Sequence, residues 1–381
     1  MKIKDCYNSD DFRNLAKKRL PSPIFHYIDG GADDEVTLKR NRKAYETCDL
    51  VPNILTGVEK VDLSTTVMGQ KLEMPLFCSP TASQRLFHHE GEHAVAKAAE
   101  KFGTMFSISS LATIDLESVS SINTPKMFQV YYHKDRGLTE SMLEKCHEAN
   151  FDVLALTVDT VALGNRERDL RTGFTVPLRL SLSSILSFIT HPSWGINYLT
   201  HSKFELPILK KHIKEANFAI ALSDYFSKMI DVSINWKDAE ELRRKWGREF
   251  CIKGIMSVED AQKAVDIGAT GIIVSNHGGR QLDGSRAPFD QLTEIVDAVG
   301  DKIDIICEGG ISRGTHVLKA LSLGAKACSG ARMYLYALAA GGQNGVEKAL
   351  SNMKSELIRD MTLMGCQNTD SLSRKNIRFR N

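Results

Sequence analysis

Eight short apolar segments recur along the chain from about residue 72 onward, with helix-like segments between them. Each segment is continuously apolar, which is typical of strands buried on both faces of a parallel sheet. About eight strand–helix pairs over this length favour a closed (β/α)8 barrel, the TIM barrel, over an open doubly wound sheet. The predicted strands are MPLFCSP (74–80), TMFSISS (104–110), KMFQVYY (126–132), VLALTVDT (153–160), EFCIKGI (249–255), GIIVSNHG (271–278), IDIICEGG (303–310) and AKACSGA (325–331). The predicted helices are residues 89–103, 115–122, 137–150, 236–247, 257–268, 289–300, 313–324 and 333–364.

The same pattern divides the chain into parts. Residues 1–70 precede the first strand and form a predicted N-terminal cap of helical and extended segments. Residues 71–381 form the barrel, interrupted after the fourth strand by a long insertion at 161–235. A connection of that length inside a compact domain usually serves as a lid or a docking surface.

Composition narrows the classes of partner. The chain has 49 Lys and Arg against 47 Asp and Glu, which leaves a net charge of +2 and argues against a nucleic-acid partner. A small anionic substrate stays compatible, because a local arginine cluster needs no global excess of positive charge. The eight cysteines include no CxxC pair, and several fall in apolar runs. We interpret them as reduced core residues of a cytoplasmic protein.

Membrane signals are confined to one segment. The N-terminal MKIKDCYNSDDF is polar and predicts no cleaved secretory signal, and no apolar stretch is long enough to span a bilayer. Residues 178–199 are apolar, interrupted by serines, and carry Phe188, Trp194 and Tyr198. Two interpretations are equally supported: peripheral contact with the inner face of a membrane, or a loop folded over the protein's own core.

Polar side chains gather where the predicted strands end. The sixth strand runs into SNHGGRQLDG (275–284), which places His277 and Arg280 at its carboxyl end. Active sites of such barrels are built from this edge. Polar side chains are costly to bury without partners, so their convergence predicts a ligand rich in donors and acceptors. The residues at the equivalent ends of the other strands are Ser109, Gln129, Tyr131, Thr157, Asp159 and Lys253.

A possible metal motif lies in HHEGEH, where His89 and His93 are four residues apart. That spacing puts two imidazoles on one helix face. No carboxylate or third ligand is placed with them, so the sequence favours a structural role and predicts no metal site.

Four motifs together resemble the FMN-dependent L-2-hydroxy acid oxidases and dehydrogenases, a family that includes glycolate oxidase, cytochrome- or quinone-linked L-lactate dehydrogenase and mandelate dehydrogenase. They are FHYIDGGADDEVTLKRN, FQVYY, ALTVDT followed by GNRERD, and SNHGGRQLDG. THPSW, within the insertion, is most similar to the bacterial L-lactate dehydrogenases. The resemblance implies an FMN cofactor and oxidation of an L-2-hydroxy acid, with L-lactate favoured. It further implies a quinone or cytochrome as electron acceptor and a homotetramer.

The resemblance also implies roles for the polar residues. His277 matches the active-site base, and an imidazole suits proton transfer near neutral pH. Asp159 matches the carboxylate that orients this histidine and stabilises its imidazolium form. Tyr131 would face the substrate hydroxyl. In the substrate-binding group, Arg280 would hold the substrate carboxylate as a bidentate fork, assisted by Tyr27 and Arg166.

The implied FMN contacts fall on seven strand ends. Ser109, Gln129 and Thr157 match residues at the pyrimidine edge of the ring, and Lys253 matches the cation near N1 and O2. The remaining matches are the backbone of Pro80, Thr81 and Ala82 near N5, Glu308 for the ribityl hydroxyls, and Gly309, Gly310, Arg313, Ala331 and Arg332 for the phosphate.

Three positions depart from the family pattern. Glu308 replaces an aspartate, Ser312 replaces a basic residue, and Ala331 replaces a glycine. We hypothesise that these changes weaken FMN binding.

Three alternative functions stay open. The first is an oxidase that passes electrons to oxygen and releases peroxide. The second is a relative acting on a larger hydroxy acid, a peptide or a pathway intermediate, because Leu111 stands where some relatives have tryptophan. The third is a flavin-binding protein without turnover, which is disfavoured because His277 and Arg280 are both present.

Overall fold

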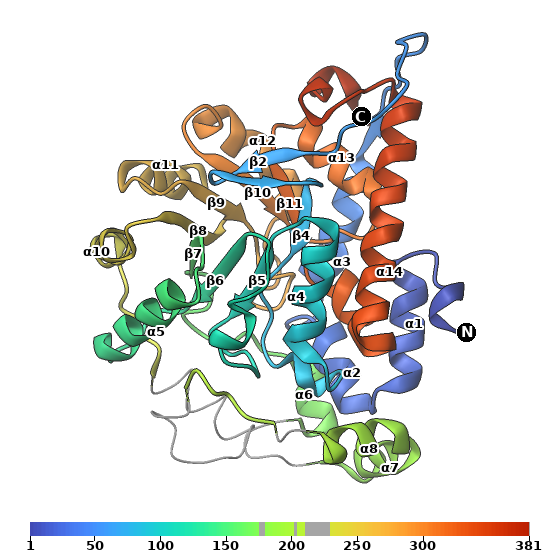
Figure 1. Cartoon of the computed structure of the whole chain (residues 1–381), viewed down its shortest axis with the longest axis vertical. Coiled ribbons are helices and arrows are strands. Elements are labelled where there is room, and N and C mark those ends of the chain that lie inside the picture. Colours follow the sequence, from blue (N-terminus) through green and yellow to red (C-terminus); the bar gives the residue numbers. More distant parts are fainter. Residues whose placement is uncertain (175–179, 202–203, 210–228, 381) are drawn as a thin grey trace.

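The computed structural model describes residues 1–174, 180–201, 204–209 and 229–380, and within them eight parallel strands form a nearly closed barrel surrounded by helices (Figure 1). The strands run in the order β4-β11-β10-β9-β8-β7-β6-β5. The end strands β4 and β5 are neighbours, and Thr104 Oγ1 donates to the Leu76 carbonyl across this seam at 2.6 Å. The predicted TIM barrel is therefore confirmed. Its strands are β4 (Leu76–Cys78), β5 (Phe106–Ser109), β6 (Lys126–Val130), β7 (Val153–Thr157), β8 (Glu249–Ile255), β9 (Gly271–Val274), β10 (Asp304–Glu308) and β11 (Ala327–Gly330).

The barrel helices match the predicted ranges to within a few residues, with one exception. The segment 115–122 was expected to be helical, but it contains only the 3-10 helix η4 (Glu117–Val119). There Ser118 Oγ donates to the Asp115 carbonyl at 2.6 Å, and such local bonds compete with a continuous helix. The barrel helices are α4 (Gly91–Phe102), α5 (Arg136–Glu148), α10 (Trp236–Trp246), α11 (Val258–Asp266), α12 (Pro288–Val299), α13 (Gly314–Ser322) and α14 (Arg332–Met364).

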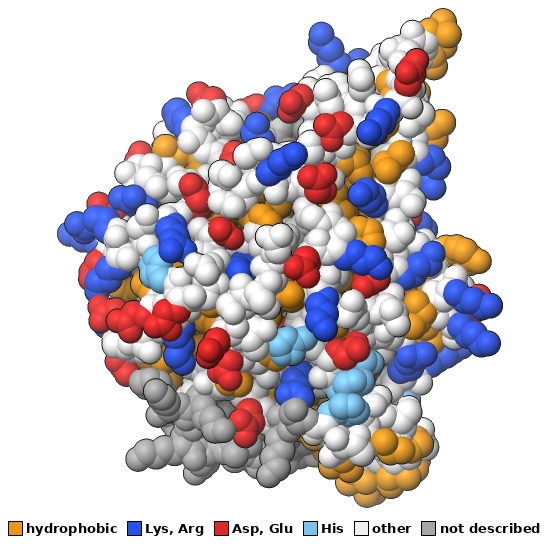
Figure 2. Space-filling model, viewed as in Figure 1, with side chains coloured by type: hydrophobic (Ala, Val, Ile, Leu, Met, Phe, Trp, Pro, Cys, Tyr) orange, Lys and Arg blue, Asp and Glu red, His pale blue; other side chains and the backbone are white. Residues whose placement is uncertain are grey.

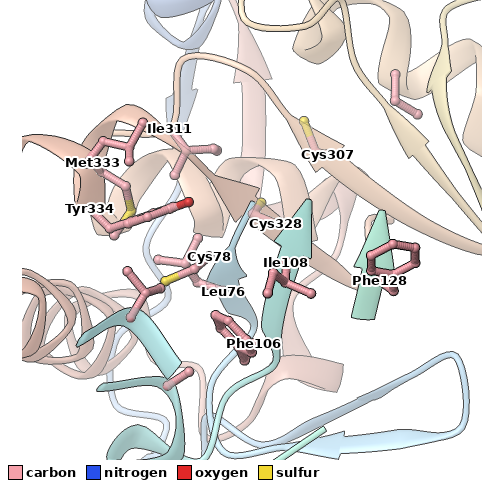
Figure 3. Close-up of a cluster of buried hydrophobic side chains, with 14 of the residues drawn as sticks. Leu76, Cys78, Phe106, Ile108, Phe128, Cys307, Ile311, Cys328, Met333 and Tyr334 are labelled. Carbon is pink, nitrogen blue, oxygen red and sulfur yellow. The ribbon is translucent and has the colours of Figure 1, made fainter. Parts of the chain in front are cut away.

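Residues along each strand alternate between two cores. The outward side chains pack under the helices, as Leu76, Cys78, Phe106 and Ile108 do near Tyr334 of α14 (Figure 3). The inward side chains form a second cluster, separate from the first. It contains Val67, Met68, Leu72, Phe77, Met105, Met127, Val153, Ala155, Cys251, Ile273, Ile306 and Ala327.

The amino end of the barrel is closed by the antiparallel hairpin β2 (Thr65–Val67) and β3 (Gln70–Leu72). Its side chains belong to the inward cluster, and the Met68 amide donates to Asp304 Oδ2 at 2.6 Å. The lower half of the barrel interior is therefore packed with apolar side chains.

The N-terminal residues form helices α1 (Ser9–Arg19), α2 (Ser22–Asp29) and α3 (Val36–Lys43). They are followed by β1 (Cys48–Leu50), which pairs with β12 (Ile377–Phe379) near the C-terminus. The expected insertion after β7 contributes α6 (Glu167–Thr172), α7 (Leu182–Thr190) and α8 (Pro192–Thr200). In Figure 1 these helices lie at the opposite end of the barrel from β2. Residues 175–179, 202–203 and 210–228 of the expected insertion lie outside the described residues.

All eight cysteines are buried free thiols. Across the described parts of the chain, no helix combines the length and apolar character that crossing a bilayer requires.

Candidate active site

A layer of polar side chains lies above the apolar interior of the barrel. Side chains along a strand point alternately into and out of the barrel. The residue two positions after an inward apolar residue therefore also points into the barrel, nearer its carboxyl end. Each of the eight strands has a polar residue at, near or directly after its carboxyl end, and all eight residues are buried. The layer consists of Ser79, Ser109, Gln129, Thr157, Lys253, Ser275, Glu308 and Ser329.

A cavity of about 610 Å³ opens above this layer. This volume is in the range of small-molecule and cofactor sites. Two residues expected at the site, Asp159 and Arg313, are not on its wall. The other expected residues all line it: Tyr27, Pro80, Thr81, Ala82, Ser109, Gln129, Tyr131, Thr157, Arg166, Lys253, His277, Arg280, Glu308, Gly309, Gly310, Ala331 and Arg332.

His277 stands on a left-handed turn just beyond β9. Its φ is +57°, and those of Gly278 and Gly279 are +65° and +74°. A non-glycine residue in this region costs on the order of 1–3 kcal/mol, and such strain clusters at functional sites. The turn is held by a bond from the His277 amide to Ser275 Oγ at 3.0 Å. A Cβ on Gly279 would lie 2.5 Å from the Leu38 amide nitrogen, so the second glycine lets α3 pack against the turn.

Asp159 acts on the cavity through His277. His277 Nδ1 lies 2.9 Å from Asp159 Oδ1, and the Thr160 hydroxyl, 3.3 Å from the same nitrogen, also donates to Asp159 at 2.9 Å. Burial raises the pKa of Asp159, but the nearby His277 and Lys253 lower it more, so this carboxyl stays charged. A charged carboxylate accepting from Nδ1–H leaves Nε2 to accept a proton.

Arg280 and Arg166 form a cationic spot on the wall. Burial lowers the pKa of Arg280, and Arg166 and Arg332 lower it further, while Asp169 of α6 opposes them. Among the described residues, Arg280 Nη1 donates to the Gly30 carbonyl at 2.9 Å, and its guanidinium lies 5.3 Å from the centre of the Tyr27 ring. An anion stabilises neighbouring buried guanidinium groups. A carboxylate suits this role because its two oxygens can accept two parallel N–H bonds from one guanidinium.

Tyr131 is the third group on this wall. It is buried, and burial together with the charge of Asp159 raises the pKa of its phenol. The phenol therefore stays protonated near neutral pH, as a hydrogen-bonding group beside the histidine.

The floor of the cavity contains a buried ion pair between Lys253 and Glu308. Ser275 and Ser329 each donate to a Glu308 oxygen at 2.7 Å, and Lys253 Nζ lies 3.3 Å from Ser275 Oγ. Burial raises the pKa of Glu308, but Lys253 and the two serines lower it more, so this carboxyl is ionised. One ammonium and one carboxylate thus share the floor.

Unsatisfied polar atoms show that the cavity suits a polar ligand. Among the described residues, Gln129 Nε2, Thr157 Oγ1 and Ser312 Oγ are buried on the wall without a hydrogen-bond partner. A buried polar group without a partner costs about 1–3 kcal/mol. The isoalloxazine edge, ribityl chain and phosphate of FMN supply such partners, so the residues present fit this cofactor.

The residues expected at the phosphate adopt mixed positions. Gly309 and Gly310 line the cavity with φ values of +141° and +71°, whereas Ala331 has φ −98°, which alanine adopts without strain. Arg332 donates to the carbonyls of Ile28, Gly30 and Gly278 at 2.9 Å each. Arg313 pairs with Glu356 at 2.9 Å, away from the wall.

Other groups at the site were not expected from the sequence. Asp29 is 4% exposed and accepts bonds from Arg13, Arg168 and Tyr336 at 2.5–2.8 Å. Asp169, one helical turn after Arg166, faces the arginines. The motifs SNHGG and ACSGA contain the two serines that bind Glu308, but their polar side chains were not assigned a role.

Comparison with known proteins agrees with this geometry. The family model described as FMN-dependent dehydrogenase matches residues 16–379. An L-lactate oxidase of Nostoc sp. is 40% identical over 369 residues, 96% of each chain. A glycolate oxidase of Spinacia oleracea is 38% identical over 371 residues, 97% of this chain and 95% of the relative. The solved structure of a monotopic membrane protein, (S)-mandelate dehydrogenase, superposes with a TM-score of 0.94 at 32% identity, covering 99% of this chain and 100% of that one.

The barrel, its polar layer and the histidine–arginine wall define a class of flavin-binding oxidoreductases. The chain belongs to the FMN-dependent dehydrogenase family. Its cofactor is FMN, and its reaction is the oxidation of a 2-hydroxy acid.

Proposed function

We propose that the protein oxidises L-lactate to the 2-keto acid, with His277 as base. The observation that carries the proposal is that His277, hydrogen-bonded to Asp159, shares a cavity wall with Arg280 and Tyr131. Arg280 binds the substrate carboxylate, with Tyr27 and Arg166 beside it. This orientation presents the substrate hydroxyl to Tyr131 and His277.

His277 Nε2 then takes a proton from the substrate, and the ionised Asp159 stabilises the resulting imidazolium. The residues that would hold FMN are those of the polar layer together with the backbone of Pro80 to Ala82. FMN, when bound, accepts the two electrons. Buried Leu111 and Phe87 on the wall exclude water from the reacting groups.

The nature of the relatives supports a small substrate. The relatives include proteins named L-lactate oxidase and glycolate oxidase. Their names equally support the alternative in which oxygen is the acceptor and peroxide is released. The mandelate dehydrogenase and mandelate oxidase structures support the alternative of a larger substrate.

The visible spectrum of the purified protein, recorded without oxygen before and after adding L-lactate, tests this proposal. We expect the flavin bands to bleach with L-lactate and not with D-lactate. The variant His277→Gln should keep its bands and lose the bleaching. Bands that persist in the wild type with L-lactate but bleach with mandelate would transfer the assignment to a larger acid.

A second proposal concerns the electron acceptor: the protein meets a membrane surface through α7 and α8 and reduces a quinone there. Leu182, Leu186 and Ile189 of α7 are 86%, 59% and 68% exposed, and Leu199 of α8 is 81% exposed. These positions form an apolar stripe on the outer face, where a surface helix normally carries polar residues. Figure 2 shows hydrophobic side chains gathered at the lower right, where Figure 1 places these helices.

The inner face of the same helices is anchored to the protein. Trp194 Nε1 donates to the Leu86 carbonyl at 2.8 Å, and Ser187 Oγ accepts from the Ser22 amide at 2.8 Å. Phe188 and Trp194 pack against the main core. The expected packing of this segment over the protein's own core is therefore present within residues 180–199, and the exposed apolar side chains support the membrane proposal. Residues 178–179 of the segment lie outside the described residues.

Vesicle flotation tests the membrane proposal. We expect the wild type to float with anionic phospholipid vesicles and the double variant Leu186→Asp, Ile189→Asp to stay in the soluble fraction. Leu363→Asp changes an equally exposed leucine on α14; this variant is the matched control and should float.

Faster flavin reoxidation by oxygen than by a quinone analogue would favour the oxidase. The cytoplasmic location and the homotetramer belong to the same proposal, and light scattering measures the latter.

A further inference from the structure

One wall of the cavity joins the loop after β10 to helix α3. A Cβ on Gly310 would lie 2.1 Å from the Asn41 carbonyl oxygen and 2.9 Å from the Arg42 amide nitrogen, so α3 rests directly on this turn. Consecutive left-handed glycines expose backbone amides in the manner of anion-binding nests. Ser312, two residues on, is 9% exposed, and its hydroxyl lies on the wall without a partner among the described residues.

This wall needs positive charge if it is to hold the phosphate of FMN. Of the three barrel-loop residues expected there, Ser312, Arg313 and Arg332, only Arg332 is a cation on the wall. Ser312 is neutral. Arg313 forms an ion pair with Glu356. Three N–H groups of Arg332 already donate hydrogen bonds to backbone carbonyls.

The cations that the N-terminal helices bring to the cavity wall are Arg13 of α1 and Lys39, Arg42 and Lys43 of α3. Of these four, Arg42 is the one whose backbone lies directly against Gly310.

Arg13 and Arg42 differ in how deeply their ion pairs are buried. Arg13 is bound to Asp29, which is almost completely buried. Arg42 forms two bonds to Asp10, at 2.7 and 2.6 Å, but both side chains are about half exposed, 49% and 48%. Half-exposed ion pairs contribute little to stability, so a stronger anion can take the place of Asp10.

Asp10 itself shows that the spot is positive. The bond from Arg42 lowers the pKa of its carboxyl, and the charges of Arg313 and Arg13 add to this effect. A carboxylate therefore already occupies an anion-favouring position beside the cavity. A phosphate group carries more negative charge than a carboxylate and accepts the guanidinium fork equally well.

We propose that Arg42 of α3 binds the phosphate of FMN, supplying from the N-terminal helices the cation that position 312 lacks, in competition with Asp10. The inference rests on the FMN assignment and adds a residue to it. It makes the N-terminal segment part of the cofactor site.

The experiment compares the dissociation constants of FMN and riboflavin, which differ by the phosphate. Both are measured by fluorescence quenching on the full chain freed of flavin. Arg42→Ala should weaken FMN binding by about tenfold or more and leave riboflavin binding unchanged. Arg40→Ala, on the same helix but off the cavity wall, is the matched control. Ser312→Arg in the Arg42→Ala background should restore FMN binding.

Asp10→Asn separates this role from a structural one. It breaks the same ion pair as Arg42→Ala, but it should tighten FMN binding by a few fold. If both variants weaken FMN, or if Arg42→Ala weakens FMN and riboflavin alike, the pair is merely structural and the inference is overturned. Bleaching of the wild-type flavin by L-lactate is a separate measurement. The substrate proposal and the Arg42 proposal can therefore be refuted independently of each other.

Discussion

Lys253 and Glu308 form an ion pair on the floor of the cavity in which the two side chains are 4% and 9% exposed. The resemblance to known enzymes had implied separate roles for them, one beside the flavin ring and one at the ribityl chain. The structure joins them, with the Glu308 carboxylate in contact with the Lys253 ammonium and with the hydroxyls of Ser275 and Ser329. The carboxylate therefore offsets part of the positive charge that this lysine would present to the flavin.

The pair predicts an effect on the flavin's reduction potential. Removing the carboxylate charge with Glu308→Gln should raise the potential, because an unbalanced ammonium favours the electron-rich reduced cofactor. A shift of about 30 mV corresponds to about 1.4 kcal/mol for a two-electron couple. Spectroelectrochemical titration measures it, and Glu308→Asp, which keeps the charge, is the control. An unchanged potential in Glu308→Gln would mean that Lys253 does not act on the ring.

Asp159 should be needed for turnover but not for cofactor binding. Asp159→Asn removes the charge that stabilises the His277 imidazolium, and we expect kcat to fall on the order of 10³-fold. Because Asp159 is not on the cavity wall, the FMN dissociation constant should stay within about twofold of the wild type. Stopped-flow reduction and flavin titration give the two values. A comparable loss in both would contradict this separation.

Leu111 should limit the size of the substrate. It is 2% exposed and lines the cavity, so Leu111→Ala enlarges the site. We expect kcat/KM for an aromatic 2-hydroxy acid to rise relative to that for L-lactate, at a stability cost of about 2–5 kcal/mol. Leu116→Ala, equally buried but off the wall, should cost similar stability and leave the ratio unchanged.

Asp29 should make the N-terminal helices sensitive to acid. Burial raises its pKa, but bonds from Arg13 and Tyr336 lower it more, to about 2 against an ordinary value of 3.8. A carboxyl whose pKa is lower in the folded state contributes stability above the ordinary pKa and loses it as the pH falls toward 2. That contribution is about 2 kcal/mol at neutral pH.

Urea unfolding of Asp29→Asn against the wild type measures this contribution. The difference between the two proteins should be full at pH 7 and shrink steadily as the pH falls below about 4. Asp49→Asn, which removes an exposed pair with Arg380, is the control. Arg380 also lowers the pKa of Asp49, but solvent screens this exposed pair, so its trend should be much smaller. A difference independent of pH would show that Asp29 acts through packing alone.

The barrel was predictable because its strands are short, apolar and regularly spaced. The polar residue two positions beyond each inward apolar one also follows from strand periodicity, which is why Gln129, Thr157 and Lys253 could be assigned together. Local bonding was harder to foresee, and the Ser118 bond to Asp115 replaced an expected helix with a single 3-10 turn.

Contacts between distant segments were not predictable from patterns along the chain. Asp29 and Tyr336 are 307 residues apart, and Arg42 and Asp10 lie on different helices. Nor does sequence show how far a side chain reaches. Arg313 and Arg332 were both expected at the phosphate. The structure turns Arg313 to Glu356, away from the cavity wall, and keeps Arg332 on the wall with three N–H groups on backbone carbonyls.

The β2–β3 hairpin has a kinetic consequence. With the amino end closed and the lower interior packed, substrate and electron acceptor share the opening at the carboxyl end. We therefore expect an acceptor small enough to enter the cavity to do so only after the keto acid has left, which is a ping-pong scheme. Double-reciprocal plots at several acceptor concentrations should then be parallel, and an acceptor too large for the cavity has to collect its electrons at the rim.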